Sequence, residues 1–187
     1  LWGREEGKGF TKFKEGYNAN LANGLGNLVS RTLKMAEQYF DGHLVGNASM
    51  VPPLRTRIKV VTDLGDLEGL NIPYLTTNDL LPRYHAHMHA NEVNKAADVI
   101  WELISHLDQF IADYEPFKLV KTDKETTEHI VWGLLFGLNE VAKMLVPIMP
   151  DTAQKIKELI GTPTIDEEQQ GIVFDIKVPE EPLFMRR

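Results

Sequence analysis

The chain has 187 residues with 20 basic and 27 acidic side chains, which give a formal net charge of −7. It contains no cysteine, which excludes disulfide scaffolds, cysteine zinc sites, thiol nucleophiles and iron–sulfur clusters and fits a reducing, cytoplasmic location. No apolar run approaches the ~20 residues of a membrane span, and an acidic total of this size argues against a nucleic-acid partner. The first residue is leucine, so we expect a piece of a longer protein.

The first predicted element is a helix from about residue 11 to residue 40. Apolar residues recur there at spacings of three and four, and Asp41-Gly42 supplies a stop. Residues 1–34 carry six basic and three acidic side chains, whereas residues 35–187 carry 14 basic and 24 acidic ones. The acidic total therefore belongs to the rest of the chain, and the first helix is locally basic.

One face of this predicted helix is unusually polar. At 100° per residue, five side chains fall within about 80° of one another; they are Asn20, Asn23, Asn27, Arg31 and Lys34. Asparagine is a poor helix former, so three of them on one face need an explanation. They either cap the helix and bond to a neighbouring loop, or they offer amide and guanidinium groups that read the edges of unpaired RNA bases.

Residues 44–76 are predicted to be an irregular insertion, because prolines and glycines divide them into short pieces and only residues 58–61 suit a brief extended run. A helix resumes at Thr77-Asn78, where either side chain is placed to cap it. A long amphipathic helix follows from residue 93 and ends at Glu115-Pro116, since a proline pushes the preceding residue out of the helical region.

The next predicted helix begins at Thr122, with Glu125 three residues later in the register of a capping box. A short last helix spans residues 151–160, and residues 171–178 have the pattern of one isolated strand. Helices that are apolar on one face must bury those faces against each other. The predicted fold is therefore all-α: an antiparallel bundle of about five helices with an irregular insertion and an extended C-terminal tail.

Two stretches offer ligand-binding chemistry with an alternative explanation for each. His85 and His89 lie one helical turn apart, a spacing that can chelate zinc, but Ala86 stands where a metalloprotease needs glutamate. A solvated helix face is the favoured interpretation, and we expect neither a metal site nor a catalytic residue. Phe117 lies between Pro116 and Lys118 at a predicted helix end; it either plugs the bundle or forms a platform for base stacking.

Four blocks of this sequence resemble the anticodon-binding domain of methionyl-tRNA synthetases, and together they cover most of residues 10–161. In chain order they are YNANLANGLGNLVSR at 17–31, NKAADVIWELI at 94–104, DYEPFKL at 113–119 and LVPIMPDTA at 145–153. The sequence PLF at 182–184 is similar to the segment that closes the synthetase core. The resemblance implies a helical bundle of the class I synthetase type, which binds the anticodon stem-loop of tRNA(Met).

The resemblance also implies roles for particular residues. In this family an asparagine and an arginine one turn apart on the first helix contact anticodon bases, and these positions match Asn27 and Arg31. A tryptophan directly after the proline stacks on a splayed base; Phe117 stands there instead, with less ring area and no indole donor. The expected tRNA-binding residues are therefore Asn20, Asn23, Asn27, Arg31, Lys34 and Phe117.

The adenylating half of such an enzyme is missing from the sequence, which has neither its His-Ile-Gly-His-like signature nor its Lys-Met-Ser-Lys-Ser loop. The resemblance implies a parent enzyme that attaches methionine to tRNA with ATP and Mg²⁺, while this chain needs no cofactor. We expect residues 1–9 to be a linker from the catalytic domain, residues 10–161 the anticodon-binding domain, and residues 162–187 a tail with one short strand. The expected partners are the tRNA(Met) anticodon stem-loop and that catalytic domain, not DNA or a membrane.

Two alternatives remain open at this point. One is the anticodon-binding domain of a sister class I synthetase, for cysteine, isoleucine or valine, which the Asn27 and Arg31 pair disfavours. The other is a helical protein–protein interaction module without an RNA role. Because the net charge is −7, RNA binding cannot depend on bulk attraction to phosphates and must depend on a few placed groups.

Overall fold

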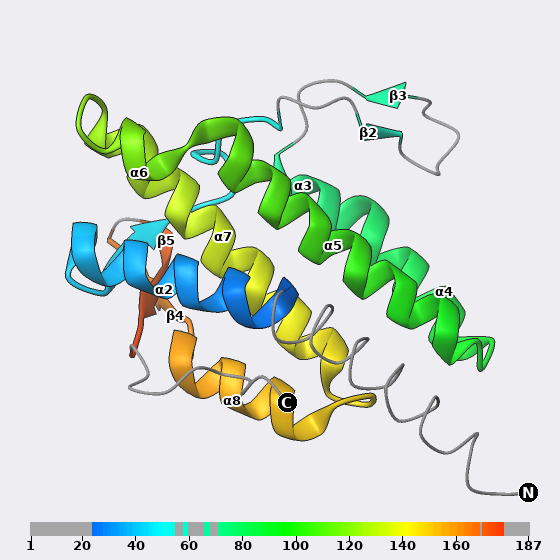
Figure 1. Ribbon diagram of the computed structural model, residues 1–187. Helices are drawn as coiled ribbons and strands as arrows, with labels where there is room; N and C mark the ends of the chain where they lie inside the picture. The colour runs from blue at the N-terminus through cyan, green and yellow to red at the C-terminus, as the bar shows by residue number, and fades with distance from the viewer. Residues whose placement is uncertain (1–23, 55–57, 60–65, 68–70, 169, 178–187) are drawn as a thin grey trace, which may run out of the picture.

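The computed structural model describes residues 24–54, 58–59, 66–67, 71–168 and 170–177 of the chain. Its helical elements are α2 (Gly26–Phe40), α3 (Ile72–Leu75), the π-helical turn η2 (Thr76–Leu80), α4 (Leu81–His89), α5 (Val93–Tyr114), α6 (Pro116–Leu119), α7 (Lys124–Leu145) and α8 (Pro150–Ile160). Its strands are β1 (His43–Gly46), β2 (Ile58–Lys59), β3 (Asp66–Leu67), β4 (Thr164–Asp166) and β5 (Gly171–Asp175). Figure 1 shows these elements along the chain.

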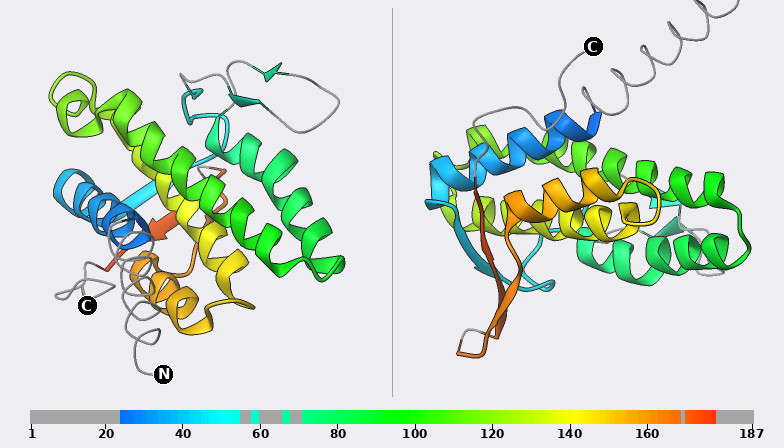
Figure 2. Two further views of the ribbon diagram at one scale, coloured as in Figure 1. Left: turned by 45° about the vertical axis from the view of Figure 1, so that its right-hand side comes forward. Right: turned by 90° about the horizontal axis from the view of Figure 1, so that it is seen from below.

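Helix α7 forms the centre of the bundle. It packs against α2, α3, α5 and α8, and its buried residues lie on nearly all sides of the helix. The other long helices are amphipathic and turn one apolar face towards it, so that the core lies around α7 (Figures 1 and 2). The predicted helical bundle is confirmed. Within the described ranges, no helix is both long and apolar enough to cross a membrane.

A small antiparallel sheet lies beside the bundle, with strand order β1-β5-β4. Strand β5 pairs with β1 and with β4, in registers that include Leu44↔Phe174 and Ile165↔Ile172. The strand predicted near the C-terminus is therefore not isolated but central. The reason is that its partner β1 directly follows α2, far away in the sequence, where a four-residue strand leaves no readable alternation.

Trp132 joins this sheet to α7. Its side chain is 1% exposed, and its Nε1–H donates a hydrogen bond of 2.8 Å to the Ile172 carbonyl of β5. The ring meets Phe174 edge-on, with centroids 6.0 Å apart. A Cβ atom at Gly46 of β1 would lie 2.9 Å from the ring, so glycine is required there for the strand to approach the indole. One buried side chain thus fixes where both strands lie.

Two helix starts differ from the sequence prediction. The stretch predicted to begin at Thr77-Asn78 begins at Ile72, because the Asn71 side chain caps it by accepting from the Tyr74 N–H at 2.9 Å. Pro73, which looks like an interruption in the sequence, lies in the first turn, where no hydrogen bond needs its nitrogen.

Helix α7 is capped one residue later than predicted. Asp123, not Thr122, accepts from the Thr126 N–H at 2.9 Å. The described part of the predicted insertion is also more regular than expected, since it contains most of β1, all of β2, β3 and α3, and the first residue of η2. The brief extended run expected at residues 58–61 agrees with β2 at residues 58 and 59, and residues 60 and 61 lie outside the described residues.

A half-buried network of charges holds η2 and α4 against α5. The Arg83 guanidinium donates to Asp79 at 2.9 Å and to both oxygens of Glu102 at 3.1 and 2.8 Å. The His106 Nε2 lies 3.8 Å from Glu102. His106 and Arg83 together lower the pKa of Glu102 to about 2, against the opposing effect of burial. The Glu102 carboxylate is therefore more stable in the folded chain than in the unfolded one.

Replacing Glu102 with glutamine is expected to lower the free energy of unfolding at pH 7 by about 1–3 kcal/mol, because Arg83 loses one of its two charged partners and keeps only Asp79. The pKa of Glu102 is depressed on folding, so its stabilisation is complete above the unfolded pKa and is lost as the pH falls towards about 2. Urea unfolding of wild type and Glu102→Gln, measured from pH 7 down towards about pH 2, checks the prediction. A stability difference that stays constant with pH would contradict it.

Candidate nucleic-acid interface

Helix α2 carries three of the predicted site residues on its solvent side. Asn27 and Lys34 are exposed, and the Arg31 side chain is 40% exposed. The opposite side of the helix, including Leu28 and Leu33, is buried against the bundle. Asn27 and Arg31 are separated by one helical turn, so their amide and guanidinium groups point to the same solvent region. Asn20 and Asn23 lie outside the described residues.

Asp108 of α5 is a neighbour of Arg31 that sequence reasoning missed. Its Oδ1 lies 3.6 Å from Nη1 of Arg31, and its side chain is 38% exposed. Burial raises the pKa of the Asp108 carboxyl, and the Arg31 charge partly opposes this rise. The pair comes from two helices far apart in the sequence, and no pattern within either helix indicates it. It brings an acid into the predicted anticodon face.

Phe117 begins the second part of the candidate interface. Glu115 adopts a left-handed conformation with φ of 44°, which ends α5 and turns the chain into Pro116 and α6. Pro116 is buried, whereas the Phe117 side chain remains 44% exposed. Phe110, on the preceding helix, is fully buried and fills the core instead. This exposure favours a platform for stacking over a plug at the end of the bundle.

Cationic groups accompany the exposed ring. The Lys118 Nζ lies 5.8 Å from the Phe117 ring centroid and 2.6 Å from a carboxylate oxygen of Glu115. Lys121 is exposed in the loop before α7. The Lys124 Nζ, at the start of α7, lies 5.6 Å from the ring centroid of Phe40 at the end of α2. The α6–α7 corner and the end of α2 are therefore close together.

The two parts of the interface belong to neighbouring elements. Arg31 contacts α5 through Asp108, and α5 continues for about 9 Å before it ends at Tyr114, three residues before Phe117. Figure 1 shows α2 crossing α7, with the C-terminal end of α2 turned towards the α5–α6 corner. The Arg31 guanidinium therefore lies beside the helix that leads to the exposed ring, and Asn27 lies one turn from Arg31 on α2.

The histidines of α4 give a metal site no support. His85 and His89 are exposed, and His87 Nδ1 lies 2.8 Å from a carboxylate oxygen of Glu92. Within the part of the chain that the structure describes, no group of three side chains is arranged to hold a metal ion.

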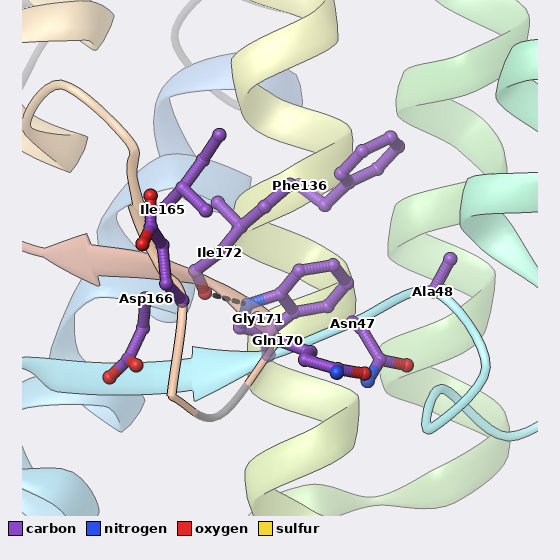
Figure 3. Close-up of a pocket in the computed structure, with 10 residues that line it drawn as sticks. Asn47, Ala48, Phe136, Ile165, Asp166, Gln170, Gly171 and Ile172 are labelled. Atoms are coloured by element: carbon purple, nitrogen blue, oxygen red, sulfur yellow. Dashed lines mark hydrogen bonds between the residues drawn. The ribbon is translucent and has the colours of Figure 1, made fainter.

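A separate hollow of about 520 Å³ lies between α7 and the sheet. Figure 3 shows Phe136, Ile165, Asp166 and Ile172 among the residues around it. Trp132 and Glu167 also line the hollow. Ile165, on strand β4, is 79% exposed. A mainly apolar hollow whose charged lining residues are the acids Asp166 and Glu167 does not suit the phosphates of RNA. The candidate RNA interface is therefore the face formed by α2 and the α5–α6 corner.

Comparisons with known proteins agree with this architecture. A family model described as the anticodon-binding domain of methionyl tRNA ligase matches residues 64–172. The methionine–tRNA ligase of Fusobacterium nucleatum is 33% identical over 160 residues, which are 84% of this chain and 22% of that protein. That of Enterococcus faecalis is 30% identical over 159 residues, with the same coverages of 84% and 22%.

The fold also matches solved structures. Apo Mycobacterium tuberculosis methionyl-tRNA synthetase superposes with a TM-score of 0.67 at 22% identity, over 93% of this chain and 34% of that chain. The same enzyme in complex with methionyl-adenylate gives a TM-score of 0.66 at 23% identity, over 91% and 32%. This chain thus spans about a fifth of the length of the curated relatives it matches. The resemblance seen in the four sequence blocks is confirmed, and the chain belongs to the family of methionyl-tRNA ligase anticodon-binding domains.

Proposed function

We propose that this chain recognises the CAU anticodon of tRNA(Met) through the face formed by α2 and the α5–α6 corner. The observation that carries the proposal is the exposed pair Asn27 and Arg31, one turn apart on α2, where Arg31 lies beside α5, the helix that leads to the exposed Phe117 ring. Unpaired bases expose hydrogen-bonding edges and flat faces, and these are the two features that such groups bind.

Each group has a distinct part in this recognition. The Asn27 amide both donates and accepts, and the Arg31 guanidinium offers a planar set of donors to a base edge. The Phe117 ring stacks on a base that is splayed out of the loop. Lys34, Lys118 and Lys121 contact phosphates, which adds affinity without sequence preference. Asn20 and Asn23 extend the polar face of the first helix in the proposal.

The rest of the proposed enzyme lies outside this chain. The relatives are methionine–tRNA ligases, and we propose that the protein containing this chain attaches methionine to tRNA(Met) in the cytoplasm, with ATP and Mg²⁺ held by a separate catalytic domain. Residues 1–9 would link the two domains, residues 10–161 would form the anticodon-binding domain, and the tail at 162–187 would pack where they meet. The chain itself contributes recognition of the tRNA.

Binding of labelled anticodon stem-loops to the 187-residue chain tests the proposal. We expect the CAU loop to bind better than loops with cysteine, isoleucine or valine anticodons. Three lysine–phosphate contacts predict that log K falls against log salt with a slope of about −2 to −3. Preference for a sister anticodon would assign the domain to another synthetase. No RNA binding at ~50 mM salt would instead support a protein-interaction module.

Replacing Phe117 with leucine is expected to weaken binding of the CAU loop by about 1–3 kcal/mol, because the flat stacking surface is lost while an apolar side chain remains. The CAU loop and a loop with a changed first anticodon base should lose the same binding free energy, since stacking does not read a base edge. Fluorescence anisotropy with both loops checks this. An unchanged affinity would remove Phe117 from the interface, whereas Phe117→Trp should restore or increase binding.

A further inference from the structure

The ion pair of Arg31 differs from that of Arg83, the other arginine with an ion pair among the described residues. Arg83 uses two nitrogens in three hydrogen bonds of 2.8–3.1 Å with Asp79 and Glu102, and its side chain is 25% exposed. Arg31 approaches Asp108 through one nitrogen at 3.6 Å, which is too long for a hydrogen bond, and is 40% exposed. Among the described residues, no other acceptor contacts the Arg31 guanidinium. Its donors are therefore available to a ligand.

Asp108 is a half-buried carboxylate with one described cationic neighbour. The pKa of its carboxyl is raised because burial disfavours the charged form, and the charge of Arg31 only partly opposes this rise. No N–H or O–H in the described part of the chain donates a hydrogen bond to its oxygens. An exposed ion pair of this length adds little stability, and the partial burial of the carboxylate opposes folding. The stability of the bundle thus gives no reason for an acid at this position.

The charge of Asp108 does change what Arg31 can do with RNA. A lone guanidinium attracts phosphates of any sequence, and this attraction is strong at low salt. With a carboxylate 3.6 Å away, the net charge of the pair is close to zero while the N–H donors stay directed to solvent. Such an arginine gains free energy chiefly when a base acceptor meets its donors with the correct geometry.

We propose that Asp108 is a specificity-determining residue of the anticodon interface: it cancels the charge of Arg31 without occupying its donors, so that Arg31 selects a base edge instead of attracting any phosphate. This inference rests on the proposed function. The proposed role also explains why an acidic residue lies on the RNA-binding face, although the chain already carries a net charge of −7.

The test is Asp108→Asn in the 187-residue chain, with binding of the CAU stem-loop and of the same loop with a changed first base measured over a salt series. The variant should bind the changed loop more tightly with little gain for the CAU loop, so that the affinity ratio falls about 3- to 10-fold. Its salt slope should steepen by about 0.7–1, as for one added phosphate contact. Asp98→Asn is the matched control, since Asp98 is exposed on the same helix. It removes the same charge and should leave the ratio unchanged.

The outcomes separate the inference from the proposed function. If wild type prefers the CAU loop but Asp108→Asn keeps the same ratio and salt slope, the inference is overturned and the proposed function stands. An equal effect of Asp98→Asn would assign the change to bulk charge and also overturn the inference. In the Arg31→Ala background, Asp108→Asn should leave the ratio unchanged; a further fall would show that Asp108 acts without Arg31. Wild type that binds both loops equally would contradict both proposals.

Discussion

Replacing Trp132 with alanine is expected to lower the free energy of unfolding by about 3–5 kcal/mol, the largest loss we predict for a single side chain. The ring is 1% exposed and stacks on Phe136 with centroids 5.7 Å apart at 23°. Its removal leaves a cavity between α7 and the sheet, and the Ile172 carbonyl loses the donor that lies 2.8 Å away. The loss should therefore detach β5, and with it β1 and β4, from the bundle.

Urea unfolding followed by circular dichroism measures this effect without relying on tryptophan fluorescence. Trp101→Ala is the matched control, because Trp101 is only partly buried and should cost clearly less. If Trp132→Ala does not fold, Trp132→Phe keeps most of the ring and should lose about 1–2 kcal/mol through the missing hydrogen bond and the smaller volume. A loss below about 1 kcal/mol for Trp132→Ala would show that the sheet is not held through this residue.

Replacing Arg31 with alanine is expected to weaken binding of the CAU loop by about 1–3 kcal/mol, which is roughly 5- to 150-fold in Kd. The same change should affect a loop with a changed first base much less, because there the guanidinium has no matching acceptor to lose. Discrimination between the two loops should therefore fall together with affinity. Anisotropy titrations of both loops against wild type and variant check this prediction.

Lys34→Ala is the control for charge on the same helix. Lys34 is exposed and lies less than one turn from Arg31, so it should contact phosphate rather than a base. Its loss should weaken both loops equally and make the salt slope shallower by about 0.7–1. If Arg31→Ala behaves like Lys34→Ala, with equal loss for both loops, Arg31 is a phosphate contact and does not read a base.

The sequence predicts the long helices of this fold well. Helix α5 begins at Val93 and ends at Tyr114 as expected, because its apolar stripe is continuous and Pro116 follows. Helix α8 ends before Gly161, which has a positive φ that glycine tolerates. Helix α2 ends at Asp41-Gly42 in a left-handed turn. These signals are local: each depends on residues within a turn or two of the helix that they define.

Non-local features could not be predicted in this way. The pairing of β1 with β5 depends on strands of four and five residues that are distant in the sequence, and on Trp132 between them. The Asn71 cap is hidden because Pro73 resembles a break. For the site, the exposed polar face of α2 is readable from its period, whereas Asp108 becomes visible only when α2 and α5 are placed together.

The most direct test of the account is the ratio of two dissociation constants for the wild-type chain: that of the CAU stem-loop and that of the same loop with its first anticodon base changed. Because one base edge read by placed donors is worth about 1–3 kcal/mol, we predict a preference for CAU of at least about fivefold. The preference should persist from ~50 to ~200 mM salt while both affinities fall. Equal dissociation constants for the two loops across that range would contradict anticodon recognition by this face.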